Sequence, residues 1–219
     1  MGRMIRLAAN DSHEFDAWLA EPEGTPKAGV IILQEIFGIT RHIRAVTDQY
    51  ASLGYRALAP GLFDRVRPGT DLDYTAVDQG REIMMSLDLD LAVRDIDACA
   101  AWLADAGKIA AVGYCWGGAM ADLAACRSRI DCAAAYYGRM IVDWLDERPR
   151  CPVIYHFGET DPLIPPDVVQ SIRGGRPDGE FHVYPGAGHG FNCNDRADFD
   201  AEAAALALQR TLAFFDRNL

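Results

Sequence analysis

The stretch GYCWGG, residues 113–118, stands between the apolar run 109–112 and a segment of helical pattern at 116–126. A cysteine in a glycine-flanked turn between a strand and a helix is the arrangement of a nucleophile elbow. Such a turn is too tight for bulky neighbours, so glycines stand two residues before and two residues after the nucleophile. The alternative interpretation of Cys115 is a buried thiol that packs as a small hydrophobe.

The helix expected after Cys115 gives a chemical reason to prefer the first interpretation. Unpaired N–H groups and the dipole at a helix N-terminus favour a negative charge. Such surroundings lower the pKa of a thiol and generate the thiolate, which is the nucleophilic form. Cys115 is therefore the candidate nucleophile.

Strand-like and helix-like segments alternate on both sides of this turn. The expected strands are 4–9, 14–22, 30–34, 55–60, 108–114, 132–138, 152–158 and 180–185. The expected helices are 41–53, two pieces of 74–106 that meet near Ser86, 116–126, 165–172 and 199–217. The first two strands read as an antiparallel edge pair, and continuous apolar runs mark strands buried on both faces. The alternation predicts an α/β fold, a mostly parallel central sheet with helices on both faces, in a single domain over residues 1–219.

The composition excludes several classes of protein. A net charge of −11 and a pI near 4.8 argue against a nucleic-acid surface, which needs a basic stripe. No apolar run approaches the roughly 18 residues of a membrane span, and the opening stretch lacks the apolar centre of a signal peptide. The six cysteines include no C-x-x-C pair, and no histidine pair has metal-ligand spacing. We therefore expect a cytoplasmic protein with reduced thiols, no metal and no contact with nucleic acid or membrane.

Two further residues match the chain order nucleophile, acid, histidine that this architecture uses. Asp161 lies four residues beyond the strand expected to end at Phe157, and His189 lies in a glycine-rich loop after the last strand. Each has a structural alternative, because Asp161 could cap a turn before Pro162 and His189 could bond within its own loop. Their joint occurrence in the expected order favours a catalytic triad with Cys115.

An oxyanion hole needs two backbone N–H groups near the nucleophile. The elbow predicts one from Trp116 and the other from Ile36, in the loop after the strand 30–34. Glu35 precedes Ile36, and a carboxylate at the end of a central strand is costly unless it is hydrogen-bonded or paired. Either Glu35 acts on the thiol, or it is a surface or loop carboxylate paired with an arginine.

Five segments occur together in this sequence and in this order: QEIFG (34–38), GYCWGG (113–118), YYG (136–138), FGETDPLIP (157–165) and GAGHGF (186–191). In combination they resemble the dienelactone hydrolase (carboxymethylenebutenolidase) family of the α/β-hydrolase fold. The resemblance covers nearly the whole chain. It implies a triad of Cys115, His189 and Asp161, and a Glu35 that contacts the resting thiol and influences its protonation. It implies no cofactor.

The resemblance also implies substrates that are lactones or small esters, typically carrying a carboxylate, in the catabolism of aromatic compounds. Members of the family hold the substrate carboxylate with two arginines. Arg81 is the candidate for the first. The position four residues after the histidine holds Cys193, so Arg196 is the candidate for the second. Where the family places a tyrosine, this sequence has Met84 and Met85.

Together these observations predict a cysteine-dependent hydrolase of lactones or small esters that forms an acyl-enzyme on Cys115. Two alternatives keep the fold and the reactive thiol: a ligand-binding or redox-sensing protein without turnover, and an acyltransferase. The expected partner is a small-molecule lactone or ester, and the expected assembly is a monomer or a homodimer.

Overall fold

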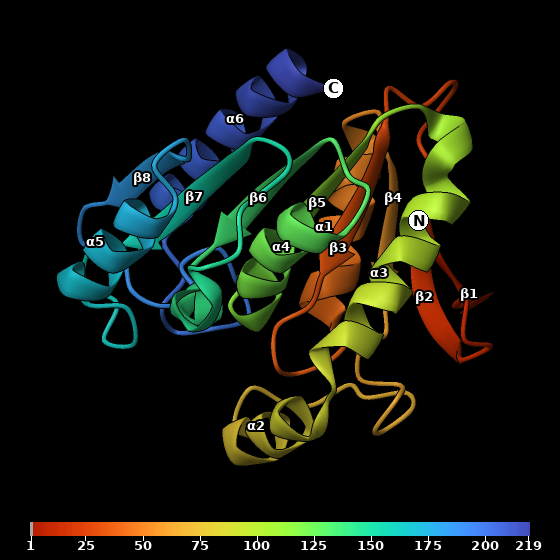
Figure 1. The fold of residues 1–219 in the computed structure, drawn as a ribbon, viewed down its shortest axis with the longest axis horizontal. Helices are drawn as coiled ribbons and strands as arrows, with labels where there is room; N and C mark the ends of the chain where they lie inside the picture. Colours follow the sequence, from red (N-terminus) through yellow and green to blue (C-terminus); the bar gives the residue numbers. More distant parts are fainter. Residues whose placement is uncertain (1) are drawn as a thin grey trace.

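The computed structural model describes residues 2–219, which form one eight-stranded sheet in the order β1-β2-β4-β3-β5-β6-β7-β8 (Figure 1). The strands are β1 (Arg3–Ala8), β2 (Glu14–Ala20), β3 (Gly29–Leu33), β4 (Arg56–Pro60), β5 (Ile109–Tyr114), β6 (Cys132–Tyr136), β7 (Val153–Gly158) and β8 (Glu180–Tyr184). The helices are α1 (Arg41–Ser52), α2 (Val77–Ser86), α3 (Leu89–Leu103), α4 (Trp116–Arg127), α5 (Pro166–Gly175) and α6 (Ala201–Asn218). Two short 3₁₀ helices are η1 (Ala104–Ala106) and η2 (Arg139–Trp144).

The sheet is mostly parallel with an antiparallel edge. β1 pairs antiparallel with β2, and β2 pairs antiparallel with β4. Every further neighbour along the sheet is parallel. The predicted edge pair and the predicted fold class are both confirmed.

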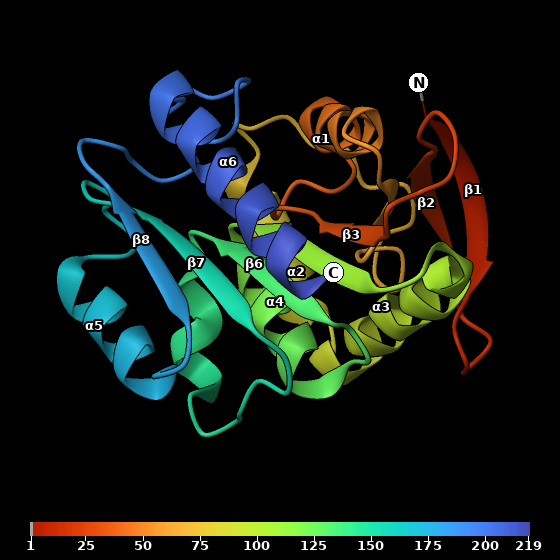
Figure 2. The same cartoon turned by 90° about the horizontal axis from the view of Figure 1, so that it is seen from above.

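Helices cover both faces of the sheet (Figure 2). α1 and α6 lie on one face, and α3, α4 and α5 lie on the other. All residues of β3, β5, β6 and β7 are buried as a result. This burial explains why these strands read as unbroken apolar runs in the sequence instead of alternating ones.

Local signals set the helix ends. Thr40 caps α1, its hydroxyl accepting from the N–H of Ile43, and the buried stripe of that helix includes Ile43, Val46 and Tyr50. Gly54 follows α1 in the left-handed region, at φ +97°, which favours glycine. Asp200 caps α6, so that helix begins two residues later than position 199, where the sequence suggests its start.

The region 74–106 divides into two helices, as expected from the break near Ser86. The first, α2, begins only at Val77, and the second, α3, begins after Asp88, whose carboxylate accepts from the N–H groups of Asp90 and Leu91. The short helix η2 was not anticipated from the sequence. Figure 1 shows α2 beyond the carboxyl ends of the parallel strands. The residues of the candidate site lie at this end of the sheet.

Candidate active site

Cys115 forms the link between β5 and α4. Its backbone is left-handed, φ +56° and ψ −116°, although it is not a glycine. A sparsely populated conformation of this kind costs about 1–3 kcal/mol and persists where surrounding contacts enforce it. Here the N–H of Cys115 donates to the carbonyl of Tyr136 at 3.0 Å, and its carbonyl accepts from Ala119 at 3.2 Å. The predicted elbow is present.

The flanking glycines are required by close backbone packing. A Cβ at Gly113 would lie 1.7 Å from the carbonyl oxygen of Gly117, and a Cβ at Gly117 would lie 2.2 Å from that of Leu33. Both distances are far inside van der Waals contact. The elbow can therefore form only with glycine at these two positions.

The structure brings Cys115, His189 and Asp161 into one hydrogen-bonded chain. The Nε2 atom of His189 lies 3.2 Å from the Sγ of Cys115, and its Nδ1 lies 2.7 Å from Oδ2 of Asp161. The other carboxylate oxygen of Asp161 accepts from the N–H of Leu163 at 2.8 Å. His189 and Asp161 are buried, and Cys115 is half-buried. The thiol is thus the outermost member of the chain.

The charge state of His189 follows from these neighbours. Burial alone would lower the pKa of the imidazole. The negative charge of the Cys115 sulfur and the hydrogen bond to Asp161 outweigh that effect and raise the pKa of His189 to about 10. The raised pKa favours the protonated form of His189.

The two N–H groups expected to form an oxyanion hole are available. Ile36 follows β3, and Trp116 is the first residue of α4, which follows β5. β3 and β5 are neighbouring parallel strands in which Leu33 pairs with Gly113, so the segments that follow them begin side by side. Neither N–H donates to an acceptor within residues 2–219. Unpaired donors at this place fit the stabilisation of a developing negative charge.

Glu35 is fully buried, and the one polar partner of its side chain within residues 2–219 is Arg196. Oε1 of Glu35 lies 3.4 Å from a guanidinium nitrogen of Arg196, while Oε2 has no hydrogen-bond partner among residues 2–219. Burial lowers the pKa of Arg196, but the charges of Glu35 and then Cys115 raise it overall. The expected pairing with an arginine is therefore present, although Glu35 lies in the interior and not on the surface. The resemblance implies a contact between Glu35 and the thiol of Cys115. No hydrogen bond within residues 2–219 joins these two side chains, and the side chain that contacts Cys115 Sγ is that of His189.

The remaining candidate substrate-binding residues differ in burial. Arg81 is exposed on α2 and forms no side-chain hydrogen bond within residues 2–219. Its neighbour Gly80 packs against the loop that contains Ile36, since a Cβ there would lie 2.4 Å from the carbonyl oxygen of Ile36. Arg196 reaches the interior directly. Cys193 is buried, and its thiol donates to the hydroxyl of Tyr74 at 3.2 Å.

One residue at this edge was missed by reasoning from the sequence. Tyr137 follows β6, is fully buried, and packs its ring 5.2 Å from the ring of His189. Its backbone is left-handed, at φ +38°. The signal that could have identified it is its place directly after a central strand, within YYG.

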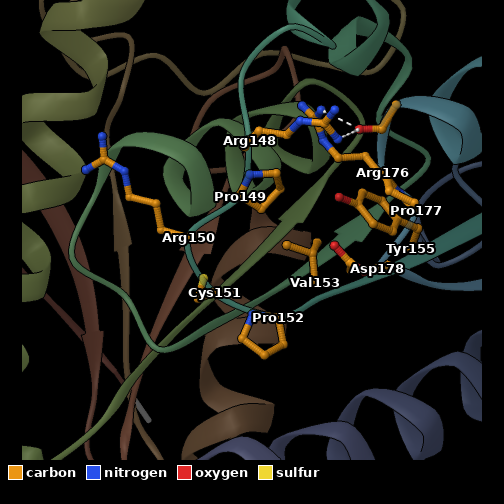
Figure 3. Close-up of a pocket in the computed structure, with 12 residues that line it drawn as sticks. Arg148, Pro149, Arg150, Cys151, Pro152, Val153, Tyr155, Arg176, Pro177 and Asp178 are labelled. Atoms are coloured by element: carbon orange, nitrogen blue, oxygen red, sulfur yellow. Dashed lines mark hydrogen bonds between the residues drawn. The ribbon is translucent and has the colours of Figure 1, made fainter.

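The cavity in Figure 3 lies away from this chemistry. It has a volume of about 570 Å³ and is lined by residues at the amino ends of β7 and β8, including Cys151, Tyr155 and Arg176. Arg176 forms a buried ion pair with Asp122 at 2.8 Å, which also accepts from the hydroxyl of Tyr155. Its charge thus has a structural partner, and the parallel strands separate this cavity from the triad.

Within residues 2–219 no group of three or more histidine, cysteine or acidic side chains could hold a metal ion. All six cysteines are unpaired thiols. In the same range no helix is long and apolar enough to cross a membrane.

A mostly parallel sheet with a glycine-flanked strand-to-helix turn after β5, an acid after β7 and a histidine after β8 has the architecture of an α/β-hydrolase. The sequence profile of the Dienelactone hydrolase family matches residues 15–219, and the chain belongs to that family. It is a carboxymethylenebutenolidase-like hydrolase.

The sequence is similar to those of carboxymethylenebutenolidases over nearly its full length. The chain is 33% identical over 222 residues to the carboxymethylenebutenolidase of Pseudomonas putida, covering 96% of this chain and 94% of the relative. It is 30% identical over 221 residues to carboxymethylenebutenolidase 1 of Cupriavidus pinatubonensis, with 95% and 94% covered. The structure of a candidate dienelactone hydrolase from Klebsiella pneumoniae superposes with a TM-score of 0.86 at 29% identity, covering 99% of each chain.

Proposed function

We propose that this protein hydrolyses lactones or small esters through a covalent acyl-enzyme on Cys115. The observation that carries the proposal is the unbroken chain from the Cys115 thiol through His189 to Asp161, with contacts of 3.2 Å and 2.7 Å. The names of the relatives support the substrate class, because carboxymethylenebutenolidases open a lactone ring.

Acylation uses the thiolate as nucleophile. The sulfur of Cys115 attacks the carbonyl carbon, and the N–H groups of Ile36 and Trp116 donate to the oxygen that becomes negative. The tetrahedral intermediate then collapses, and the carbon–oxygen bond to the leaving group breaks. His189 gives its proton to the leaving oxygen, while Asp161 holds the ring in position.

Deacylation reverses these roles. The neutral His189 removes a proton from water, and the resulting hydroxide attacks the thioester carbon. The carbon–sulfur bond breaks, which restores the thiolate of Cys115 and the imidazolium of His189. The acid product leaves, and no cofactor takes part in either half of the reaction.

Three charged residues supply substrate recognition and tuning in this proposal. Glu35 places a buried carboxylate at the site and holds Arg196 there. Arg196, which pairs with Glu35 at 3.4 Å, binds a carboxylate of the substrate. Arg81 extends from the helix that packs on the oxyanion loop and binds the same carboxylate from the solvent side.

The test compares turnover of a dienelactone and of simple aryl esters by the wild type and by Cys115→Ala. Cys151→Ala is the matched control, because Cys115 and Cys151 are the two half-buried cysteines of the six, the other four being buried. The proposal predicts that only Cys115→Ala abolishes hydrolysis. Residual turnover in that variant would contradict it. A stoichiometric burst without turnover would favour a binding or redox-sensing protein, and transfer of the acyl group to an added alcohol would favour an acyltransferase.

A further inference from the structure

Tyr137 combines two energetically unfavourable features at the edge of the candidate site. Its backbone is left-handed, at φ +38°, which an aromatic residue rarely adopts. Its side chain is fully buried, yet its hydroxyl has no hydrogen-bond partner within residues 2–219. A buried, unpaired hydroxyl destabilises the folded chain. The residue is better explained by an action at the site than by a contribution to stability.

The position of Tyr137 is beside the reacting groups. The carbonyl of Tyr136 accepts from the N–H of Cys115 at 3.0 Å, so the chain reaches Tyr137 directly alongside the elbow. The ring then packs against His189, with centroids 5.2 Å apart, and against Phe191, with centroids 5.3 Å apart. A hydrogen bond from the N–H of Tyr137 to the carbonyl of His156, at 2.7 Å, holds the strained backbone.

An unpaired acceptor lies at the same end of the sheet, since Glu35 follows β3 and Tyr137 follows β6. Oε2 of Glu35 is buried without a hydrogen-bond partner among residues 2–219, while Oε1 contacts Arg196. Burial and, after it, the charge of Glu35 raise the pKa of Tyr137, so the phenol remains protonated and able to donate. A hydroxyl group has one donor and two acceptor positions. A single bound hydroxyl would therefore satisfy both Tyr137 and Glu35.

The reaction supplies such a hydroxyl only when the substrate is a lactone. When the sulfur of Cys115 attacks, a carbon–sulfur bond forms and the ring carbon–oxygen bond breaks. His189 donates its proton to that oxygen, which becomes a hydroxyl tethered to the acyl-enzyme. An ester loses its alcohol to solvent, whereas a tethered hydroxyl can attack the thioester and close the ring again. A lactone hydrolase gains from holding it away.

We propose that Tyr137 and Glu35 form a subsite for the freed hydroxyl of a ring-opened lactone. The phenol of Tyr137 donates to the oxygen of that hydroxyl, and the hydroxyl donates to Oε2 of Glu35. The inference rests on the proposed function and narrows its substrate class to lactones. Arg196, which pairs with Glu35 at 3.4 Å, has a side chain that is 21% exposed.

The experiment uses Tyr137→Phe, which removes the hydroxyl and keeps the ring. Tyr50→Phe is the matched control, because the hydroxyl of Tyr50 is also buried without a hydrogen-bond partner among residues 2–219. Tyr50 lies in α1, and its ring packs near Tyr55 and Phe215. The substrates share one acyl chain: γ-butyrolactone and ethyl butanoate. We expect Tyr137→Phe to lower kcat for the lactone about three- to tenfold, as the loss of one hydrogen bond predicts, and to change ester turnover less than about twofold. Tyr50→Phe should leave both unchanged.

A second measurement needs no variant. The wild type should be inhibited by 4-hydroxybutanoate at about three- to tenfold lower concentration than by butanoate, because only the former carries the hydroxyl. An unchanged ratio of lactone to ester turnover in folded Tyr137→Phe would overturn the inference. If that variant does not fold, equal inhibition of the wild type by the two acids would overturn it. Ester turnover that needs Cys115 would leave the proposed function standing in either case, whereas the absence of Cys115-dependent turnover would defeat both.

Discussion

The imidazole of His189 lies between the thiol of Cys115, at 3.2 Å, and the carboxylate of Asp161, at 2.7 Å. Because Asp161 accepts at Nδ1, the opposite nitrogen of the ring faces the sulfur. His189 lies 74 positions from Cys115 and 28 positions from Asp161 in the chain. The three residues meet because the parallel strands β5, β7 and β8 have their carboxyl ends on the same side of the sheet. The proposed mechanism therefore depends on the protonation state of His189.

Asp161→Asn should preserve the fold and reduce turnover by orders of magnitude. An amide at this position favours the wrong tautomer of His189, and the comparable change in a serine triad costs about 10⁴-fold. The measurement is kcat of the purified variant on an aryl ester, with circular dichroism to establish folding. Turnover near that of the wild type in a folded variant would assign the orienting role to another residue.

Stability should depend on pH through His189. Its pKa in the folded chain is about 10, above the ordinary value of 6.5. A raised pKa contributes stability that is fully present below the unfolded value and is lost as the pH rises through the folded one. The free energy of unfolding from urea titrations should therefore fall between about pH 6.5 and pH 10.

Cys115→Ala is the control for this pH dependence, because it removes the negative charge that raises the pKa of His189. The variant should lose less stability than the wild type over the same range. Other groups that titrate near pH 10 contribute equally to both proteins and cancel in the comparison. Parallel curves for the two proteins would show that the thiol and the imidazole are not coupled.

Much of the fold and of the candidate triad could be predicted from the sequence, because the controlling signals are local. Strands buried on both faces need apolar residues throughout, as in the run 109–112. The elbow needs small residues at Gly113 and Gly117, where backbone atoms approach within 1.7 Å and 2.2 Å of a hypothetical Cβ. Asp161 follows the fully buried strand β7 and His189 follows β8, the last strand, which gives each a recognisable place in the chain.

The parts that escaped prediction depend on contacts between distant segments. Which arginine pairs with Glu35 could not be predicted, because Arg196 lies 161 positions away in the chain and neither residue has a local pattern that indicates the other. Tyr137 looks like one more aromatic residue at the end of an apolar strand. The direction of the Arg81 side chain depends on how α2 packs on the loop that contains Ile36. Only Gly80 and Ile83 of that helix are buried, so its apolar pattern is too short to predict the packing.

Gly113→Ala should destabilise the protein severely, by at least about 3 kcal/mol, since the new methyl group would overlap the carbonyl of Gly117. Gly174→Ala is the matched control, because no atom lies within 4 Å of a Cβ there and the residue is inside α5. It should be neutral or stabilise by up to about 1 kcal/mol. Urea unfolding measures both variants. A mild effect at Gly113 would mean that the elbow can relax.

Arg196→Ala should destabilise the protein by about 3 kcal/mol, because it leaves the buried carboxylate of Glu35 without a partner. Adding Glu35→Gln removes the buried charge and should recover part of that loss. The free energies of unfolding of the wild type, the two single variants and the double variant form a double-mutant cycle. Strict additivity in this cycle would contradict a direct interaction between the two side chains.

The identity of the nucleophile is tested most directly by trapping the acyl-enzyme. The wild type is mixed with an activated aryl ester, quenched in acid within the first turnovers, and analysed by intact mass and peptide mapping. We expect one added acyl group, located on Cys115 in the peptide that contains GYCWGG, and no adduct on Cys151. An acyl group on another residue, or full turnover with no adduct on Cys115 in either the wild type or a slowly deacylating His189→Ala variant, would contradict it.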